Sequence, residues 1–229
     1  MSFATLGYEV RPLFSAAEIG RLQQCVADHM QRVAGAMLKP QAETEPDAPF
    51  DERIERIAAQ DHSFAQLLAT AVGTDAQRAA VAQELAHDPR LTGMAADLAG
   101  CAIGDRLWRF RLNSPSLPAS RQPWHSDVVR VTGPCSDVAI TAWIPLGKIV
   151  GADAGLEVAA GRRNAPLPHE IVAGRIAIAP HHLADGAVHY PQVPAGHGLF
   201  LDPFTPQRDA AVIGPRSRWS LVVWLKRAA

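Results

Sequence analysis

Cysteine is scarce in this chain. The 229 residues include three cysteines, Cys25, Cys101 and Cys135, and no Cys-x-x-Cys pair. An odd number of widely spaced cysteines fits neither a disulfide framework nor a zinc ribbon. We expect all three to be free thiols that pack as small buried apolar residues.

The chain also lacks an excess of charge and any long apolar run. Its formal net charge is −1, which provides no basic surface for nucleic acid or anionic lipid. Glu9 follows a short apolar start, so we expect neither a secretory signal nor a membrane span. These absences favour a soluble, cytoplasmic protein whose partner is a small molecule. The sequence says nothing about oligomeric state.

Two common kinds of catalytic motif are missing. Ser136 and Ser217 are not part of a Gly-x-Ser-x-Gly elbow, which makes a serine hydrolase an unattractive interpretation. Gly147 and Gly151 flank Lys148, but they do not open a helix as a phosphate-binding loop does. Histidine and carboxylate residues are therefore the remaining candidates for a catalytic site.

Helical patterns dominate the first half of the chain. Ser15 and Glu18 have the spacing of a capping box, and the apolar residues that follow recur at helical spacing. Together they predict a helix over residues 16–37. Proline and acidic residues at 39–50 indicate an exposed loop. Three alanine-rich segments predict further helices: 51–72, 75–87 and 89–100.

Beyond Gly104 the pattern changes to short β-rich runs separated by glycine and proline. Many short strands favour a barrel or a two-sheet sandwich over a parallel α/β sheet. We expect one domain over 1–229, with a mostly helical scaffold at 1–103 and a β core at 104–229. The expected strands are 107–112, 128–131, 138–144, 155–159, 176–179, 198–202 and 218–226.

The segment Trp124-His125-Ser126-Asp127 is the most informative feature of the chain. On a strand, residues i and i+2 point to the same face, so His125 and Asp127 would converge there. An imidazole and a carboxylate supply two thirds of the facial triad that holds non-haem Fe(II). A His-x-Asp pair also arises readily by chance, and taken alone it fits a surface or capping role better than a metal site.

The last apolar run contains a second unusual residue. Arg218 and Ser220 alternate on one face of the predicted strand 218–226. A buried strand face seldom carries arginine unless an anion meets it.

These motifs, taken in order, resemble the phytanoyl-CoA dioxygenase family of Fe(II)- and 2-oxoglutarate-dependent oxygenases over nearly the full chain. The resemblance implies a mainly β fold, a double-stranded β-helix or cupin-like jelly-roll barrel, with the N-terminal helices packed outside. The segments that carry it are Gly7-Tyr8, Leu13-Phe14-Ser15, His87-Asp88-Pro89, Leu98-Ala99-Gly100, Pro123 to Asp127, Thr141 to Leu146, Asp153 to Val158, Pro194 to Gly196, Asp202-Pro203 and Arg218 to Ser220.

The resemblance also assigns roles. His125 and Asp127 would be the first two iron ligands. Arg218 would form a bidentate ion pair with the distal carboxylate of 2-oxoglutarate, with a hydrogen bond from Ser220. Trp143 matches a residue that packs near this cosubstrate, and Asn113 is a weaker candidate for touching it.

The chain departs from the family pattern at the third ligand. The distal histidine should lie eleven positions before Arg218, and that position is Gln207. The amide oxygen of glutamine can reach the same coordination site, but it is a weaker ligand for Fe(II) than imidazole. We therefore expect weaker iron binding than in an ordinary member.

Three interpretations of Gln207 stay open. The enzyme could be active with Gln207 as a ligand, in which case Fe(II), 2-oxoglutarate and O₂ would oxidise a C–H bond of a small-molecule substrate, usually by hydroxylation. A different histidine could complete the site. Alternatively, iron chemistry is lost and the jelly-roll binds a ligand without catalysis. The candidate histidines are His181, His182, His189 and His197.

Overall fold

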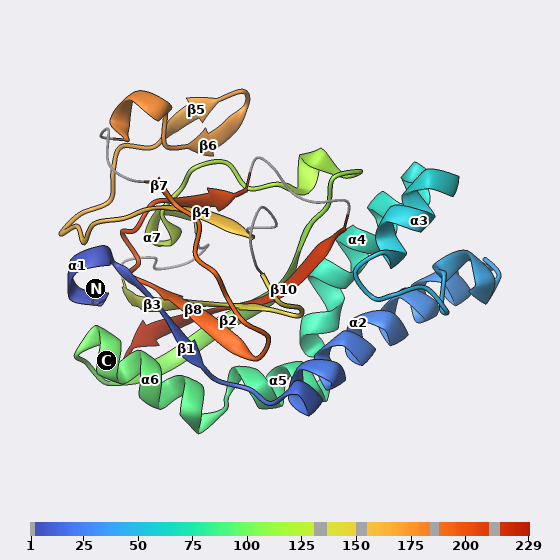
Figure 1. Cartoon of the computed structure of the whole chain (residues 1–229), viewed down its shortest axis with the longest axis horizontal. Helices are drawn as coiled ribbons and strands as arrows, with labels where there is room; N and C mark the ends of the chain where they lie inside the picture. Colours follow the sequence, from blue (N-terminus) through green and yellow to red (C-terminus); the bar gives the residue numbers. More distant parts are fainter. Residues whose placement is uncertain (1–2, 131–136, 150–154, 184–187, 211–215) are drawn as a thin grey trace.

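Two antiparallel sheets face each other, and helices cover the outer face of the larger sheet (Figure 1). The computed structural model describes residues 3–130, 137–149, 155–183, 188–210 and 216–229. Cys25 and Cys101 are free thiols, the first buried and the second half-buried, whereas Cys135 lies outside the described residues. No helix in these described ranges combines the length and apolarity needed to cross a membrane.

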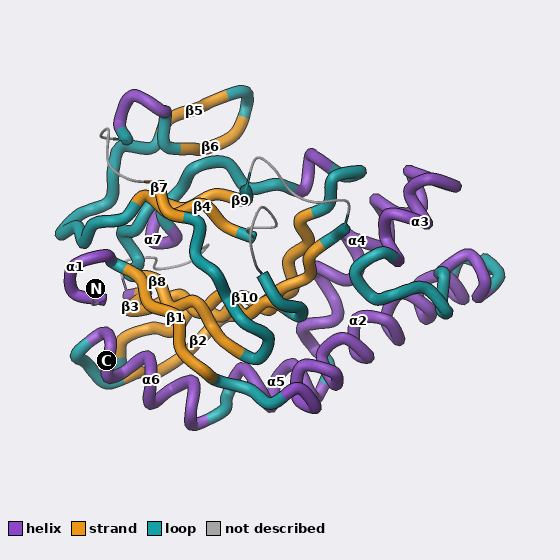
Figure 2. Tube along the Cα trace, viewed as in Figure 1, coloured by secondary structure: helices purple, strands orange, loops and turns teal. Residues whose placement is uncertain are grey.

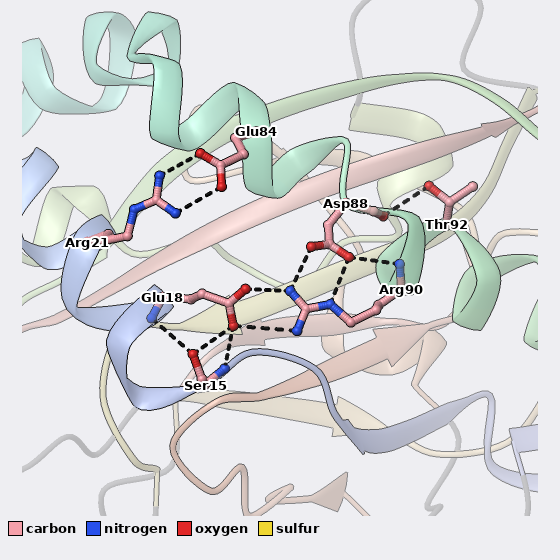
Figure 3. A network of polar contacts seen from close by, with 7 residues as sticks. All are labelled: Ser15, Glu18, Arg21, Glu84, Asp88, Arg90 and Thr92. Atoms are coloured by element: carbon pink, nitrogen blue, oxygen red, sulfur yellow. Dashed lines mark hydrogen bonds and ion pairs between the residues drawn. The ribbon is translucent and has the colours of Figure 1, made fainter.

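The helix predicted over 16–37 is confirmed as α2 (Ala16–Ala36). Its N-terminus carries the complete capping box: the Glu18 backbone N–H donates to Ser15 Oγ, and the Ser15 backbone N–H donates to Glu18 Oε2. Glu18 also meets Arg90 of α6 (Pro89–Ala99), as Figure 3 shows. The exposed pair of Arg21 with Glu84 joins α2 to α5 (Ala80–Ala86). Exposed pairs contribute little each, so they orient the helices more than they stabilise them.

The segment 51–72 forms two helices instead of the single one predicted. Asp61 lies between α3 (Arg53–Gln60) and α4 (His62–Asp75) with an extended backbone, at φ −146°. Its carboxylate accepts a hydrogen bond from the Phe64 backbone N–H, so Asp61 acts as the N-cap of α4. The shorter helical turns are α1 (Phe3–Leu6), η1 (Gln41–Thr44), η2 (Ala76–Arg78), η3 (Pro118–Ser120) and α7 (Asp127–Arg130).

The larger sheet has five strands in the order β1-β8-β3-β10-β2. Every neighbouring pair is antiparallel, and β10 lies between β3 and β2. The strands are β1 (Tyr8–Pro12), β2 (Ile103–Asn113), β3 (Val138–Pro145), β8 (His197–Leu201) and β10 (Arg218–Arg227).

The smaller sheet has three strands in the order β7-β4-β9. These are β4 (Leu156–Ala159), β7 (Val188–His189) and β9 (Gln207–Asp209). A separate hairpin of β5 (Glu170–Val172) and β6 (Arg175–Ala177) precedes η6 (Pro180–His182). Figure 2 shows this hairpin and η6 on the side of the smaller sheet, away from the helices that line the larger one.

Each face of the larger sheet packs against its own apolar cluster. Alternate residues of β10 separate them: Leu221 and Val223 pack toward the helices, while Val222 and Trp224 pack toward the smaller sheet. The second cluster also contains Val158 of β4, so it fills the space between the two sheets. The candidate site lies at the edge of this inner layer.

One predicted strand is wrong. Residues 128–131 were expected in a strand, but the chain from Asp127 to Arg130 is the helical turn α7. The Val128 and Val129 backbone N–H groups donate to the carbonyls of Pro203 and Ser126 instead of to a neighbouring strand. Local β propensity is thus overridden by a local turn at Ser126 together with a tertiary hydrogen bond to Pro203. The sequence analysis also missed β5, β7 and β9, which have two or three residues each.

Candidate metal centre

The structure brings His125, Asp127 and Gln207 together. His125 and Gln207 lie opposite each other in an antiparallel bridge and exchange two backbone hydrogen bonds of 2.9 Å. His125 Nε2 lies 3.5 Å from Asp127 Oδ1, and the Gln207 amide nitrogen donates to Asp127 Oδ2 at 2.5 Å. All three side chains are buried. His125 and Asp127 do not lie on one strand face as expected. His125 is held by its bridge to β9, and Asp127 begins the helical turn α7.

The tautomer of His125 is set by a backbone carbonyl. His125 Nδ1 lies 2.7 Å from the Pro123 carbonyl oxygen, which can only accept a hydrogen bond. Nδ1 therefore carries a proton, and Nε2 is the ring atom that faces Asp127, where it can donate to the carboxylate or bind a metal ion. Such an outer hydrogen bond is the usual way in which a metal-binding histidine is oriented.

Asp127 carries its charge at neutral pH. Burial opposes ionisation, but interactions with His125, Trp224 and Thr141 outweigh it and hold the pKa of Asp127 below its usual range. Trp224 Nε1 and Thr141 Oγ1 nevertheless have no hydrogen bond of full geometry within the described part of the chain. We regard both as longer-range polar neighbours of the carboxylate.

The donor set at this position fits a metal ion. Two ligand atoms bound at about 2.1 Å and at right angles are about 3.0 Å apart, so the 3.5 Å between His125 Nε2 and Asp127 Oδ1 needs only a small adjustment. Gln207 fits less directly, since its amide nitrogen faces Asp127. Rotation of the amide by half a turn exchanges nitrogen for oxygen. The buried imidazole and carboxylate together suit a divalent ion.

The cavity at these residues is small, with a volume of about 40 Å³. That is room for about three water molecules. Apolar walls come from Trp143, Leu156 and Val222, and polar ones from Arg111 and Gln122.

Asp209 is a cavity residue that the sequence analysis missed. It lies two positions after Gln207 on β9 and lines the same cavity, as strand alternation requires. Burial raises the pKa of Asp209 to about 6, although the Gln122 backbone N–H donates to it. The i, i+2 spacing from Gln207 would have indicated Asp209 only if residues 207–209 had been recognised as a strand.

His169 is a second residue that the sequence analysis missed. Its Nε2 accepts a hydrogen bond of 3.1 Å from the backbone N–H of Ser126, which stands between His125 and Asp127. The Ser126 hydroxyl donates to the Phe204 carbonyl oxygen at 3.0 Å. Ser126 is fully buried, so these contacts fix the chain between the two candidate ligands. Nothing local in the sequence around His169 indicates this role.

Arg218 and Ser220 do not line the metal cavity, although they share a strand face with Val222 and Trp224, which do. Arg218 lies four residues before Val222, or about 13 Å along the strand. It lines a neighbouring cavity of about 250 Å³ that also contains Lys148 and Arg216. Ser220, which lies between Arg218 and Val222 in the sequence, is buried.

Asn113 and Trp143 occupy the same inner layer. Asn113 pairs with Arg218 across β2 and β10, and its two amide atoms are buried without a hydrogen bond to any described residue. Trp143 pairs with Val222 and lines the metal cavity. Gly155 lies directly against the indole, since a Cβ at that glycine would be 2.3 Å from Trp143 Cη2.

The four alternative histidines lie elsewhere. His189 Nδ1 is 2.6 Å from the Tyr8 hydroxyl, and His197 Nδ1 is 3.3 Å from the Ala195 carbonyl oxygen. His181 and His182 approach Glu170. Across the described ranges, none of these four histidines is grouped with Asp127 in a cluster of three histidine, cysteine or carboxylate ligands. The structure thus gives no support to a substitute histidine ligand.

Comparison with known proteins adds the fold class. No protein-family model and no curated protein matches the chain. Among solved structures, AviO1 from Streptomyces viridochromogenes Tue57 is 19% identical, with a TM-score of 0.63 over 99% of this chain and 92% of that one. The non-haem monooxygenase ThoJ is 15% identical, with a TM-score of 0.60 over 98% and 75%.

A third solved structure of similar fold contains iron and the cosubstrate. The epimerase SnoN, in complex with Fe³⁺, α-ketoglutarate and nogalamycin RO, is 16% identical, with a TM-score of 0.57 over 99% of this chain and 81% of that one. At such identities the likeness shows the fold alone. The chain therefore has the fold of non-haem enzymes, and one of those similar to it holds iron and 2-oxoglutarate.

Proposed function

We propose that this protein is a non-haem Fe(II)- and 2-oxoglutarate-dependent oxygenase with a jelly-roll core, of the phytanoyl-CoA dioxygenase type. The observation that carries the proposal is the buried convergence of His125, Asp127 and Gln207, with His125 Nε2 facing the carboxylate at 3.5 Å. The solved structures of similar fold support it, because iron and 2-oxoglutarate occur among them.

Each residue of this site has its own proposed role. His125 and Asp127 would hold Fe(II), and the Pro123 carbonyl keeps the imidazole in its ligating tautomer. Bound Fe(II), with 2-oxoglutarate and O₂, supplies oxidation of a C–H bond of a small-molecule substrate. Trp143, among the apolar walls of the cavity, shields this centre from water.

Gln207 is the proposed third ligand. Its side chain already lies within hydrogen-bonding distance of Asp127, and rotating the amide would present Oε1 in place of the nitrogen. A neutral amide oxygen binds Fe(II) more weakly than imidazole. Iron affinity should therefore depend on 2-oxoglutarate more strongly than in a site with three strong ligands.

Arg218 is the proposed partner of the distal carboxylate of 2-oxoglutarate. The cavity that it lines has, among its described lining residues, Lys148 and Arg216 besides Arg218, against the carboxylate of Asp51. An excess of positive charge suits a dicarboxylate. The amide of Asn113, which lies opposite Arg218 and makes no hydrogen bond to a described residue, offers a further hydrogen bond.

The substrate would approach from the side of α4. A groove of about 260 Å³ runs between α4 and β2 and shares Arg111, Ser120 and Gln122 with the metal cavity. Its volume exceeds that of the metal cavity several times over. The reacting carbon would thus enter the metal cavity while the rest of the substrate lies in the groove.

One observation favours a second candidate, a binding protein without iron chemistry. The Gln207 amide nitrogen donates to Asp127, and this hydrogen bond satisfies the carboxylate without a metal ion. In that case the cationic cavity around Arg218 would bind an anion, and the jelly-roll would serve recognition alone.

An anaerobic titration with Fe(II) and 2-oxoglutarate separates the two candidates. A visible charge-transfer band in the native protein, absent in Asp127→Ala, would support the oxygenase. A band that appears only in Gln207→His would overturn it and favour the binding protein. Gln192→His is the matched control, because Gln192 is exposed and its amide donates to the Tyr190 carbonyl oxygen, whereas that of Gln207 donates to Asp127.

A further inference from the structure

A second group of metal-ligand side chains lies in the hairpin of β5, β6 and η6. Glu170 begins β5 and pairs with Ala177 of β6, so the chain returns to its starting point. Pro180 then opens η6, and this turn places His181 and His182 beside Glu170. The hairpin projects from the smaller sheet, as Figure 1 shows.

The three side chains are nearly arranged for a tetrahedral ion. Glu170 Oε1 lies 3.9 Å from His181 Nε2 and 3.8 Å from His182 Nε2, and all three ligand atoms fall within 4.8 Å of one another. Zinc bonds of about 2.0–2.1 Å at tetrahedral angles place neighbouring ligand atoms about 3.3 Å apart. A contraction of about 0.5 Å is therefore sufficient for the two Glu170 distances.

The side chains are free to make that contraction. The side chain of His181 is 70% exposed and that of Glu170 is 47% exposed, so neither is locked by packing. The two imidazole rings already lie side by side, with centroids 4.1 Å apart. In the part of the chain that the structure describes, this is the single three-residue set of histidine, cysteine or carboxylate ligands so closely grouped.

The chemistry of the set selects a particular class of ion. Two imidazoles and one carboxylate are ligands of zinc and similar divalent transition metals, with a water molecule in the fourth position. Ca²⁺ and Mg²⁺ prefer oxygen ligands and would not select this set. We propose that Glu170, His181 and His182 form a second site that binds a divalent transition metal such as Zn²⁺.

An ion at this site would join β5 to η6 and close the hairpin. Strand β6 of the hairpin and the residue that follows it contact the segment that carries His125. The backbone N–H of Ile178 donates to the Trp124 carbonyl oxygen at 2.7 Å, and the Arg175 guanidinium donates to that of Arg121 at 2.7 Å. His169, next to Glu170, accepts from Ser126. Binding should therefore raise the melting temperature and stiffen the support of the candidate metal centre.

Co²⁺ is the probe that tests the site, because a tetrahedral Co²⁺ complex absorbs far more strongly in the visible than a six-coordinate one. We would titrate the Asp127→Ala protein, in which the other centre has lost its carboxylate. The expected result is one equivalent of Co²⁺ with tetrahedral bands. Glu170→Gln and His182→Ala, added to this protein, should each weaken binding at least about tenfold.

The control is His62→Ala in the same background, since His62 is an exposed histidine on α4 far from the hairpin in sequence. This variant should retain the tetrahedral bands. The proposal is overturned if the Asp127→Ala protein shows no such bands, or if Glu170→Gln binds Co²⁺ as tightly as its parent. Repeating the titration in the wild-type background, where Glu170→Gln should lose one equivalent, guards against a folding defect of Asp127→Ala.

Discussion

Substitution of Gly155 by alanine should force Trp143 out of its position. A Cβ at Gly155 would lie 2.3 Å from Trp143 Cη2 and 2.8 Å from Cζ2, whereas ordinary contacts are 3.4–4 Å. The indole would have to move by more than about 1 Å in a layer that is packed to the density of a crystal. Trp143 is 7% exposed and belongs to the apolar cluster between the two sheets.

The cost follows from this overlap. Overpacking of a buried cluster by one methyl group destabilises a protein by about 1–3 kcal/mol. Gly147→Ala is the matched control, because a Cβ at Gly147 meets nothing within 4 Å. Both changes restrict the unfolded chain to the same extent, so the difference between them isolates the contact with the indole.

Urea unfolding followed by circular dichroism measures the effect. Gly155→Ala should lower the free energy of unfolding by about 1–3 kcal/mol relative to Gly147→Ala. Trp143→Phe removes the atoms that clash, so in the double variant much of the loss should disappear as a coupling energy. The reasoning is refuted if the two alanine variants unfold alike, or if the cycle shows no coupling.

Two other predictions concern ionic contacts. Arg208 donates from Nε and Nη2 to Glu157 Oε2 at 2.9 and 2.7 Å, and Glu157 is 2% exposed. Arg208→Met should destabilise the protein by about 2 kcal/mol in urea unfolding, with a smaller added loss once Glu157→Gln is present; a change below about 0.5 kcal/mol would contradict the role of the pair. Arg90 and the Ser15 backbone N–H hold the pKa of Glu18 at about 2, against a usual 4.5. The stabilisation from Glu18 is therefore present above pH 4.5 and is lost as the pH falls toward 2. In thermal melts, Glu18→Gln should be less stable than the wild type at neutral pH, with a gap that closes in acid; a constant gap would show that ionisation of Glu18 is not the cause.

Local signals explain what could be predicted from the sequence. The capping box of Ser15 and Glu18 and the apolar period behind it are contained within the segment that they describe, and α2 follows them closely. The long strand β10 likewise carries its own pattern of buried residues. Such elements need no knowledge of the rest of the chain.

The candidate site depends on contacts that local sequence signals do not predict. Residues Gln207 to Asp209 form β9, yet the segment is polar and three residues long, so nothing local indicates a strand. It is held by β4 and by the bridge to His125, which are contacts between distant parts of the chain. Asp209 was missed for this reason. The proximity of Gln207 to Asp127 was expected only through the family resemblance, and the roles of these residues stay predictions.

The error at α7 has a similar cause. Val128 and Val129 have β-branched side chains, which favour a strand when only local propensity is considered. Their backbone N–H groups are instead taken up by Pro203 and Ser126. The hydrogen bond to Ser126 is local, but the one to the distant Pro203 carbonyl is not contained in any window of sequence around Val128.

The strand order has a consequence for how the chain folds. In the larger sheet, β10 lies between β3 and β2, and β1 pairs with β8 through Tyr8 and Leu201. Helix α2 and its neighbours can form as soon as they are synthesised, but the sheet cannot be completed before residues 218–227 are available. These pairings between distant segments slow folding, because the loops between them must be closed first. During synthesis, the helical layer would therefore expose the apolar face that later covers the sheet, and it would need protection until the last strand inserts between two earlier ones.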